Sequence, residues 1–579
     1  IVDASSSLGA LAHHINGLRG FVYQRSFAKA FQTAMKTFLV DPLGAITSLI
    51  DRASEAAFAI ETDVSYGQQP LAGTEECLTR IRGVHVRNAD FGKASRRLKL
   101  IGDPRLPIED VTVDNLRVGY VRKPEANLIA NVVGLVVDGR PMAPARPGRT
   151  VRDLGGNGWT CDGLPVKVPH TWNAIDGSDG YPDGTITVNS GSSVISDSYL
   201  RKRGVYRRAL PAPTPGKRQF LRFDGASMKT EVMVNGKAVG GHKGAFTAFT
   251  LEITKALKPD GNELEVAVDN RVDETINPIN ADFNMCGGLY RTVKLIETDP
   301  VCIDPTWYGT DGVVITADPK TGRVTAEVKV SGGADRVQTF DFPNPRLWSP
   351  EEPNLYEIEI VVDENGSRDA IRRTVGFRTA EFRDGRFYLN GKKLKVYGVN
   401  RHEDYEGKGW ALEPGDDELD ARWMKAMGAT AVRLAHGAHG QGMLDETDRQ
   451  GLMAYVAIPF VNELRDTPEY RANARQETLE TIAQFRNHPS VIWWDLYNEV
   501  YNSEKDIPEG FQEEILEEMR DLVRKTDPGH ILMATTSIPE KKRLNAIPEM
   551  LSFNTYPHWY GDKDIGHYID KVLELNGRK

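Results

Sequence analysis

The hydrophobic positions in the C-terminal third of the chain follow two alternating periods. Short apolar runs, such as 394–400 and 452–458, alternate with segments in which apolar residues recur every three or four positions, such as 474–485. The first pattern is typical of strands buried on both faces and the second of amphipathic helices. Strand and helix alternate six times in this way, which predicts a parallel sheet with helices outside it.

The strand–helix repeat favours a (β/α)8 TIM barrel over residues 380–579. No glycine-rich phosphate loop follows any of the strands, which argues against a nucleotide-binding sheet. A closed barrel needs eight units, whereas the pattern supplies six before Lys579. We therefore predict an incomplete barrel. In its first helix, the apolar face that we expect to pack on the sheet carries Leu419, Trp423, Met424 and Met427.

Shorter β segments fill the middle of the chain. Alternating apolar and polar positions are separated there by turn residues, among them Asn235-Gly236, a pair typical of two-residue hairpins. A β-sandwich is predicted for residues 141–300, and a short immunoglobulin-like β-sandwich for 301–379. A hairpin around Asn390-Gly391 leads into the first barrel strand.

Residues 1–140 do not follow either scheme. Two short β units within 81–119 each end near an asparagine or aspartate. That spacing suits the rungs of a parallel β-helix, and we predict a β-helix remnant. A degenerate β segment that acts as a spacer is the alternative.

Composition excludes several classes of function. The formal net charge is −9 and no basic cluster is present, which argues against a nucleic-acid partner. No apolar run is long enough to cross a membrane. The four cysteines form no CxxC pair, so neither a zinc ribbon nor a redox pair is indicated. The first residue is Ile1 and no signal sequence follows, so a signal has been removed or the sequence is a fragment; we expect a periplasmic or extracellular location.

The candidate chemistry lies at the predicted C-terminal strand ends, where barrels of this kind carry their sites. A carboxylate, Glu499, follows the apolar strand 491–496, and Asp495 within that strand is expected to face the helices. Polar, aromatic and imidazole groups end the other strands, which is typical of a sugar site. These strand-end residues are His402, Arg433, His436, Asn498, Glu499, Asn554, Tyr556 and Trp559.

Several motifs together resemble glycoside hydrolase family 2. They are "VPHTWN" (168–173), "VNGKAVGGHKGAFTAFTLEIT" (234–254), "GGLYRTVKL" (287–295), "GVNRHED" (398–404), the stretch 429–463 and "NHPSVIWWDLYNE" (487–499). The combination "GVNRHED" with "AVRLAH" favours the β-galactosidase branch, and β-glucuronidases share enough of the motifs to stay open. The N-terminal β units are similar to the C-terminal coils of polygalacturonase-type proteins, glycoside hydrolase family 28.

The resemblance to family 2 implies that the sandwich at 141–300 is jelly-roll-like and of the sugar-binding type. It also implies a role for each site residue. Glu499 would be the general acid/base of a retaining mechanism, and Asn498 would bond the sugar 2-hydroxyl. His402, His436, Asn554 and Tyr556 match positions that contact the sugar, Trp559 would form a platform for the ring, and Asp282 matches a loop that reaches from the sandwich into the barrel mouth. The alternatives are a structural carboxylate at Glu499, core histidines, and a packing role for Trp559.

A retaining glycosidase needs a second carboxylate as nucleophile. The family places it at the end of a seventh strand, and the sequence has no such strand before Lys579. We therefore expect the nucleophile to be absent from these residues and the chain to be inactive by itself. Glu403 is better interpreted as a structural residue or as part of the wall of the site. Ala457 stands where many relatives carry an acid, which puts a metal site there in doubt. No cofactor is predicted; a divalent cation is compatible with the sequence but not supported by it.

Three hypotheses follow. The first is an exo-acting retaining β-glycosidase, a β-galactosidase or β-glucuronidase that acts on a β-linked oligosaccharide or polysaccharide-derived glycan, with neither a nucleic acid nor a membrane as partner; a homo-oligomer is compatible with it. The second is a carbohydrate-binding protein without catalysis. The third is a pectin-active protein whose activity belonged to an N-terminal β-helix.

Overall fold

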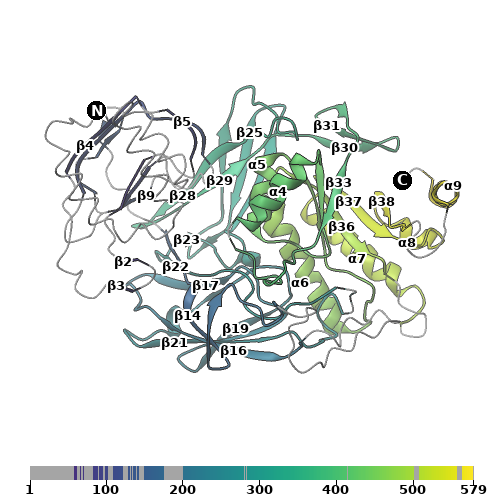
Figure 1. Ribbon diagram of the computed structural model, residues 1–579, viewed down its shortest axis with the longest axis horizontal. Coiled ribbons are helices and arrows are strands. Elements are labelled where there is room, and N and C mark those ends of the chain that lie inside the picture. Colours follow the sequence, from purple (N-terminus) through teal and green to yellow (C-terminus); the bar gives the residue numbers. More distant parts are fainter. Residues whose placement is uncertain are drawn as a thin grey trace. The chain divides into compact units, whose positions relative to one another are not determined.

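The computed structural model describes short strands between residues 58 and 141, and then residues 149–174, 200–279, 281, 283–413, 415–500, 507–556 and 564–577. The chain divides into two compact units near residue 147. Figure 1 traces the described strands and helices along the chain. Each unit is considered by itself below.

Most strand pairs described in the N-terminal unit are parallel. Strand β4 (Arg82–Arg87) pairs with β7 (Ile108–Asp114), and β5 (Asp90–Ala94) with β8 (Arg117–Val121). Asn88 and Asn115, 27 positions apart, lie at equivalent turns: both have positive φ, and Asn115 Nδ2 donates to Asn88 Oδ1 over 2.9 Å. Stacked asparagines and parallel pairing at a fixed spacing are the marks of consecutive coils in a parallel β-helix, as the sequence predicts. The remaining strands are β1 (Phe58–Glu61), β2 (Ser65–Tyr66), β3 (Gln69–Pro70), β6 (Leu98–Ile101), β9 (Leu128–Ala130), β10 (Val132–Val133), β11 (Val136–Val137) and β12 (Arg140–Pro141). Among these strands, the pairs β2 with β3 and β11 with β12 are antiparallel.

The second unit begins with a β-sandwich of two antiparallel sheets. Trp159, Tyr206, Phe223 and Phe249 belong to the buried core between them. One sheet contains β13 (Arg149–Asp153), β22 (Val293–Thr298), β17 (Arg218–Phe223) and β20 (Phe249–Glu252). The other contains β15 (Leu164–Val168), β14 (Gly156–Cys161), β16 (Arg203–Leu210), β21 (Asn262–Asp269), β18 (Lys229–Val234) and β19 (Lys237–Lys243).

Both predicted Asn-Gly turns are present. Asn235 and Gly236 have φ values of 53° and 75° and connect β18 to β19. Asn390 and Gly391 have φ values of 53° and 73°. Because positive φ at both central positions is costly for most residues, this dipeptide fixes the hairpin and its register.

The immunoglobulin-like domain follows with small antiparallel sheets. Its strands are β23 (Cys302–Ile303), β24 (Val313–Asp318), β25 (Arg323–Val328), β26 (Val330–Ser331), β27 (Arg336–Asp341), β28 (Tyr356–Glu364) and β29 (Ser367–Val375). A short 3-10 turn, η5 (Trp307–Gly309), precedes β24, and another, η4 (Thr254–Ala256), follows β20. Hairpin strands β30 (Ala380–Arg383), β31 (Arg386–Leu389) and β32 (Lys392–Lys393) then lead to the barrel.

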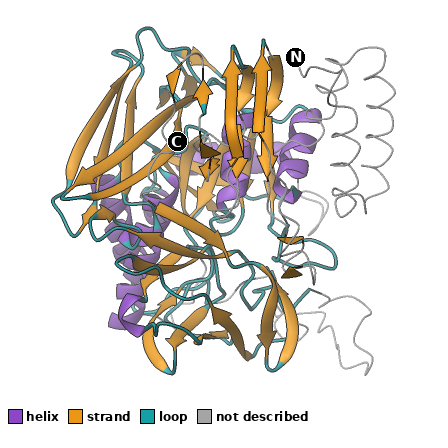
Figure 2. Cartoon of the chain, turned by 90° about the vertical axis from the view of Figure 1, so that its left-hand side faces the viewer, coloured by secondary structure: helices purple, strands orange, loops and turns teal. Residues whose placement is uncertain are grey.

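The last part of the chain is a curled sheet of six parallel strands, which fits a partial TIM barrel. In sheet order these are β33 (Gly398–Arg401), β34 (Ala431–Leu434), β35 (Met453–Ala457), β36 (Val491–Asn498), β37 (Ile531–Thr536) and β38 (Met550–Phe553). The helices are α4 (Asp416–Ala426), α5 (Gln441–Gln450), α6 (Pro468–Phe485), α7 (Phe511–Thr526), α8 (Lys542–Asn545) and α9 (Ile565–Asn576). Figure 2 shows helices gathered in this domain, whereas strands dominate elsewhere.

The helices at the two ends of this sheet differ from those at its centre. Met424 is buried, but Trp423 is 60% exposed and Met427 69%, so the prediction of a buried face was wrong for these two residues. Helix α9 has no buried residue at all. A helix beside an edge strand has a packing neighbour on one side only, whereas α6 and α7 pack on each other as well as on the sheet.

Candidate active site at the strand ends

Glu499 directly follows the buried strand β36 and adopts a left-handed backbone, with φ of 50°. Its N–H donates to the carbonyl of Thr535 on β37 over 2.8 Å, which holds this turn in place. A positive φ is uncommon for a glutamate and is found chiefly where surrounding structure imposes it. The side chain of Glu499 is partly exposed, so the carboxylate is accessible at the strand end.

Asn554, which follows β38, links two of the predicted site residues. Its Nδ2 donates to Glu499 Oε1 over 2.7 Å and to Asn498 Oδ1 over 3.3 Å. The structure therefore brings Asn498, Glu499 and Asn554 together from β36 and β38, which are separated by β37 in the sheet.

Asp495 lies inside the barrel, and the expectation that it faces the helices was wrong. It is 1% exposed, and its Oδ2 accepts from Arg433 Nη2 over 2.7 Å. Within the strand, Trp494 faces outward, since its Nε1 donates to Asp527 at the end of α7; side chains alternate along a strand, so Asp495 faces inward. The sequence pattern missed this because acidic residues are seldom fully buried.

The two histidines predicted for the site are adjacent. The ring centroids of His402, after β33, and His436, after β34, are 5.2 Å apart. Burial, with Arg433 and His402 nearby, lowers the pKa of His436 to about 2, so this imidazole is neutral at pH 7. In the part of the chain that the structure describes, no group hydrogen-bonds the buried Nδ1 of His436.

Phe283 is a site residue that the sequence interpretation missed. Its ring, carried by the sandwich, lies 5.9 Å from that of His402 and 5.5 Å from that of His436. The available signal was its neighbour, since Asp282 was predicted to reach the barrel mouth. Asp282 itself lies outside the described residues. The sandwich thus supplies part of the wall beside the histidines.

The carboxylate of Glu403 is paired with Arg291, which belongs to the sandwich. Its Oε2 accepts from Arg291 Nη2 over 2.5 Å and its Oε1 from the N–H of Gly440 over 3.3 Å. Arg291 also donates to the carbonyls of Phe246 and Ala438, over 2.7 and 3.0 Å. These contacts agree with a structural function for Glu403, as the sequence predicts.

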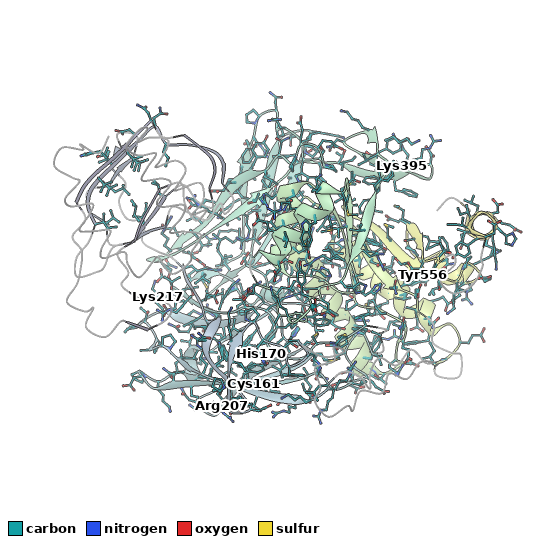
Figure 3. All side chains as sticks on the ribbon, viewed as in Figure 1. Cys161, His170, Arg207, Lys217, Lys395 and Tyr556 are labelled. Atoms are coloured by element: carbon teal, nitrogen blue, oxygen red, sulfur yellow. The ribbon has the colours of Figure 1, made fainter. Side chains whose placement is uncertain are left out.

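Of the last two predicted site residues, Tyr556 is among the described residues and Trp559 is not. Tyr556 follows Asn554 by two positions and is half exposed; Figure 3 places it beside the C-terminal strands. Trp559 lies outside the described residues, so its function as a sugar platform stays a prediction.

Among the described residues, no group of three histidine, cysteine, aspartate or glutamate side chains is arranged to hold a metal ion. The expectation that no cofactor is needed stays a prediction. The helices that the structure describes include none with the length and apolar character to traverse a membrane.

Comparison with known proteins defines the class. Three models of the glycosyl hydrolases family 2 match in order: the galactose-binding domain-like model over 194–286, the family 2 domain over 308–378 and the TIM barrel domain over 380–579. The chain belongs to this family. All three matches lie within 194–579, so the similarity of the N-terminal coils to family 28 stays a prediction.

The individual relatives are named either β-glucuronidases or β-galactosidases. The chain is 32% identical over 458 residues to a β-glucuronidase of Bacteroides fragilis, covering 70% of this chain and 63% of that one. It is 30% identical over 312 residues to a β-galactosidase of Thermoanaerobacter pseudethanolicus, covering 48% and 42%. The chain spans 63% and 50% of the lengths of the first two curated relatives.

Solved structures give the same two names. An FMN-binding β-glucuronidase from Faecalibacterium prausnitzii L2-6 matches with a TM-score of 0.66 and 30% identity, over 74% of this chain and 71% of that one. A putative β-galactosidase from Bacteroides fragilis matches with a TM-score of 0.65 and 30% identity, over 74% and 70%.

Proposed function

We propose that this protein is a retaining exo-β-glycosidase that removes terminal β-linked sugars by double displacement, with β-galactosides as the first candidate substrates. The observation that carries the proposal is the cluster of Glu499, Asn498 and Asn554 at the carboxyl ends of β36 and β38. An accessible carboxylate held by a neutral amide at this end of a barrel is suited to proton transfer to a bound sugar.

In this proposal Glu499 protonates the departing glycosidic oxygen and later deprotonates the incoming water. Asn554 donates to Oε1 of Glu499, and this leaves Oε2 as the oxygen that carries the proton. A fixed carboxylate loses less freedom when substrate binds, which favours the reactive geometry.

The remaining residues bind the sugar. Asn498 takes the 2-hydroxyl, a contact that strengthens in the transition state. Neutral His436 offers Nδ1 or its N–H to a hydroxyl group without introducing a charge. The other proposed sugar-binding residues are His402, Asn554, Tyr556, Trp559 and Asp282, and the partner is a β-linked oligosaccharide or a polysaccharide-derived glycan.

A β-glucuronidase of the same family is an equal candidate, because relatives with both names match at similar identity. A binding protein without catalysis is the candidate from a different class. A periplasmic or extracellular location and a homo-oligomer accompany the proposal as untested expectations.

A retaining mechanism needs a second carboxylate about 5 Å from the first. Among the described residues, Glu499 hydrogen-bonds to Asn554 and to the Thr535 carbonyl, and neither is a carboxylate. If no carboxylate of these residues serves as the nucleophile, we expect no turnover of phenyl β-galactoside or phenyl β-glucuronide above background. Retaining turnover by the 579 residues alone would contradict this expectation.

External azide tests the acid function directly, because it can displace the leaving group without a nucleophile from the protein. With azide, we expect an α-glycosyl azide from whichever phenyl β-glycoside fits the site, since inversion at the anomeric carbon is the only displacement. Glu499→Gln should abolish the product, because phenol is a poor leaving group that needs protonation. The matched control is Glu463→Gln, which removes a partly exposed carboxylate paired with Arg465 and should leave the rate unchanged.

The outcomes separate the candidates. An azide product from the galactoside or from the glucuronide identifies the sugar. A product that survives Glu499→Gln would remove Glu499 from the mechanism. Binding of a thioglycoside without any azide product would favour the non-catalytic alternative.

A further inference from the structure

A β-bulge in β36 places two inward-facing groups next to each other. Along β37, Asp495 is opposite Met533 and Asn498 is opposite Thr535, so three positions on β36 span two on its partner. The extra residue reverses the alternation of side chains. Asp495 and Asn498, which a regular strand would point to opposite faces, therefore both reach the barrel interior.

Arg433 on β34 connects these two residues. Its Nη2 donates to Asp495 Oδ2 over 2.7 Å and to Asn498 Oδ1 over 2.9 Å, and its Nε donates to Asp495 Oδ2 over 3.1 Å. The arginine and aspartate side chains are 11% and 1% exposed. In so buried a setting the guanidinium needs a carboxylate, because an unpaired charge there is costly.

The contacts also decide how the carboxamide of Asn498 is oriented. Arg433 Nη2 and Asn554 Nδ2 both donate to the same atom, Asn498 Oδ1. Because arginine has no acceptor, the oxygen of Asn498 must face Arg433. Its Nδ2 therefore faces away from the pair, and no acceptor within the described residues takes a hydrogen bond from it.

We propose that Asp495 is a positioning residue: through Arg433 it fixes the carboxamide of Asn498 so that Nδ2 donates to the 2-hydroxyl of the bound sugar. The proposal rests on the proposed function, because it assumes a sugar at the strand ends. Asp495 does not touch the sugar in this account. Without the charge of Asp495, Arg433 is held less firmly, and the carboxamide of Asn498 is left with the longer hydrogen bond from Asn554, of 3.3 Å, as its secure contact.

Asp527 provides a matched comparison on the outer side of the same strand. It is also a buried carboxylate, 2% exposed. Its Oδ2 accepts from Trp494 Nε1 over 2.9 Å and lies 2.6 Å from His530 Nδ1. Within the described part of the chain Asp527 forms no hydrogen bond or ion pair with Arg433 or Asn498, so Asp527→Asn reproduces the loss of a buried charge without affecting the carboxamide.

The test compares two ligands, phenyl 1-thio-β-galactoside and its 2-deoxy analogue, by isothermal titration calorimetry; the glucuronide pair is used if the galactosides do not bind. We expect the unmodified protein to prefer the 2-hydroxy ligand by about tenfold, the worth of one well-made hydrogen bond of about 1.4 kcal/mol. Asp495→Asn should reduce that preference to about twofold, and Asp527→Asn should leave it unchanged. Equal weakening of both ligands by Asp495→Asn would mean a merely structural role and would overturn the proposal.

A second measurement needs no sugar, so it remains decisive if neither ligand pair binds and the proposed function fails. With ¹⁵N-labelled asparagine, the side-chain NH2 signals of Asn498 are assigned by their loss in Asn498→Asp. We expect one shifted pair of signals in the unmodified protein and in Asp527→Asn, and movement towards solvent-exposed values or doubling in Asp495→Asn. An unaltered pair in Asp495→Asn would overturn the positioning function.

Discussion

Two buried arginine–carboxylate pairs of this protein differ in what they connect. Arg433 and Asp495 lie on β34 and β36 of the same sheet, whereas Arg291 and Glu403 join the sandwich to the barrel. In both pairs the side chains are 11% exposed or less. The first pair contacts Asn498 in the proposed site, and the second holds the backbone carbonyls of Phe246 and Ala438.

The difference shows that similar chemistry serves orientation in one place and domain docking in the other. Ala438 lies between His436 and His439, in the segment that follows β34. Docking of the sandwich on this segment therefore determines where the imidazoles lie. The barrel pair acts at shorter range, on a single carboxamide.

The largest expected effect is that of Arg291→Leu on stability. It leaves Glu403 buried without its cation, which should cost about 3–5 kcal/mol of unfolding free energy. Urea denaturation, followed by tryptophan fluorescence, measures the loss. The control is Arg207→Leu, which breaks a half-exposed pair with Glu265 and should cost about 0–1 kcal/mol.

Replacing both partners sharpens the same comparison. The double variant Arg291→Met/Glu403→Leu removes both charges of this pair, so neither is left buried without its partner and most of the lost stability should return. Sugar binding should not return to the same extent, because the carbonyls of Phe246 and Ala438 lose their donor. Full recovery of both properties would show that the pair contributes nothing to the site.

An effect of intermediate size is expected on the pH dependence of the free energy of unfolding, through His439. Arg401 Nη1 donates to His439 Nδ1 over 2.9 Å, so Nε2 carries the proton and donates to the Ala435 carbonyl. Burial, followed by Arg401, holds the pKa of His439 well below its usual value. Well below pH 6.5 the unfolded chain therefore binds one more proton than the folded chain at this residue. For each unit by which the pH is lowered there, the free energy of unfolding decreases by about 1.4 kcal/mol.

His439→Gln isolates that contribution, since glutamine offers both an acceptor and a donor but does not titrate. The slope of unfolding free energy between pH 6.5 and 5 should become shallower by about 1.4 kcal/mol per pH unit. Parallel curves for the two proteins would contradict the assignment.

The smallest effect is expected on the exposed face of α4. Trp423→Gln and Met427→Gln remove apolar side chains that are more than half exposed, so unfolding free energy should change by about 0.5 kcal/mol or less. Solubility should rise, because less apolar surface is in contact with water. Met424→Gln, on the buried side of the same helix, is the destabilising control.

Local patterns predicted much of the site. Asn498 and Glu499 were recognised as the polar end of an apolar strand, and the alternation of strands and helices placed His402, His436 and Asn554 at the same edge of the sheet. Phe283 was missed because nothing near it in the sequence records that the sandwich contacts the barrel.

The polar face of α6 was missed for the same reason. Glu480 accepts from Thr247, and Gln484 both accepts from and donates to the backbone of Ala248. The periodicity of 474–485 predicts an apolar face with Leu479, Ile482 and Phe485; Ile482 and Phe485 are buried and Leu479 is partly buried. It could not show that a second face, rich in glutamate and glutamine, would be covered by another domain.

By itself the sequence determined the periods of the strands and helices, the two Asn-Gly hairpins and the position of Glu499 at a strand end. These depend on residues that are close together in the chain. Only the tertiary structure decided that Asp495 points inward, that Arg433 orients Asn498, and that Arg291 neutralises Glu403. Each of these depends on a one-residue bulge or on a hydrogen bond between distant segments, and periodicity carries no record of either.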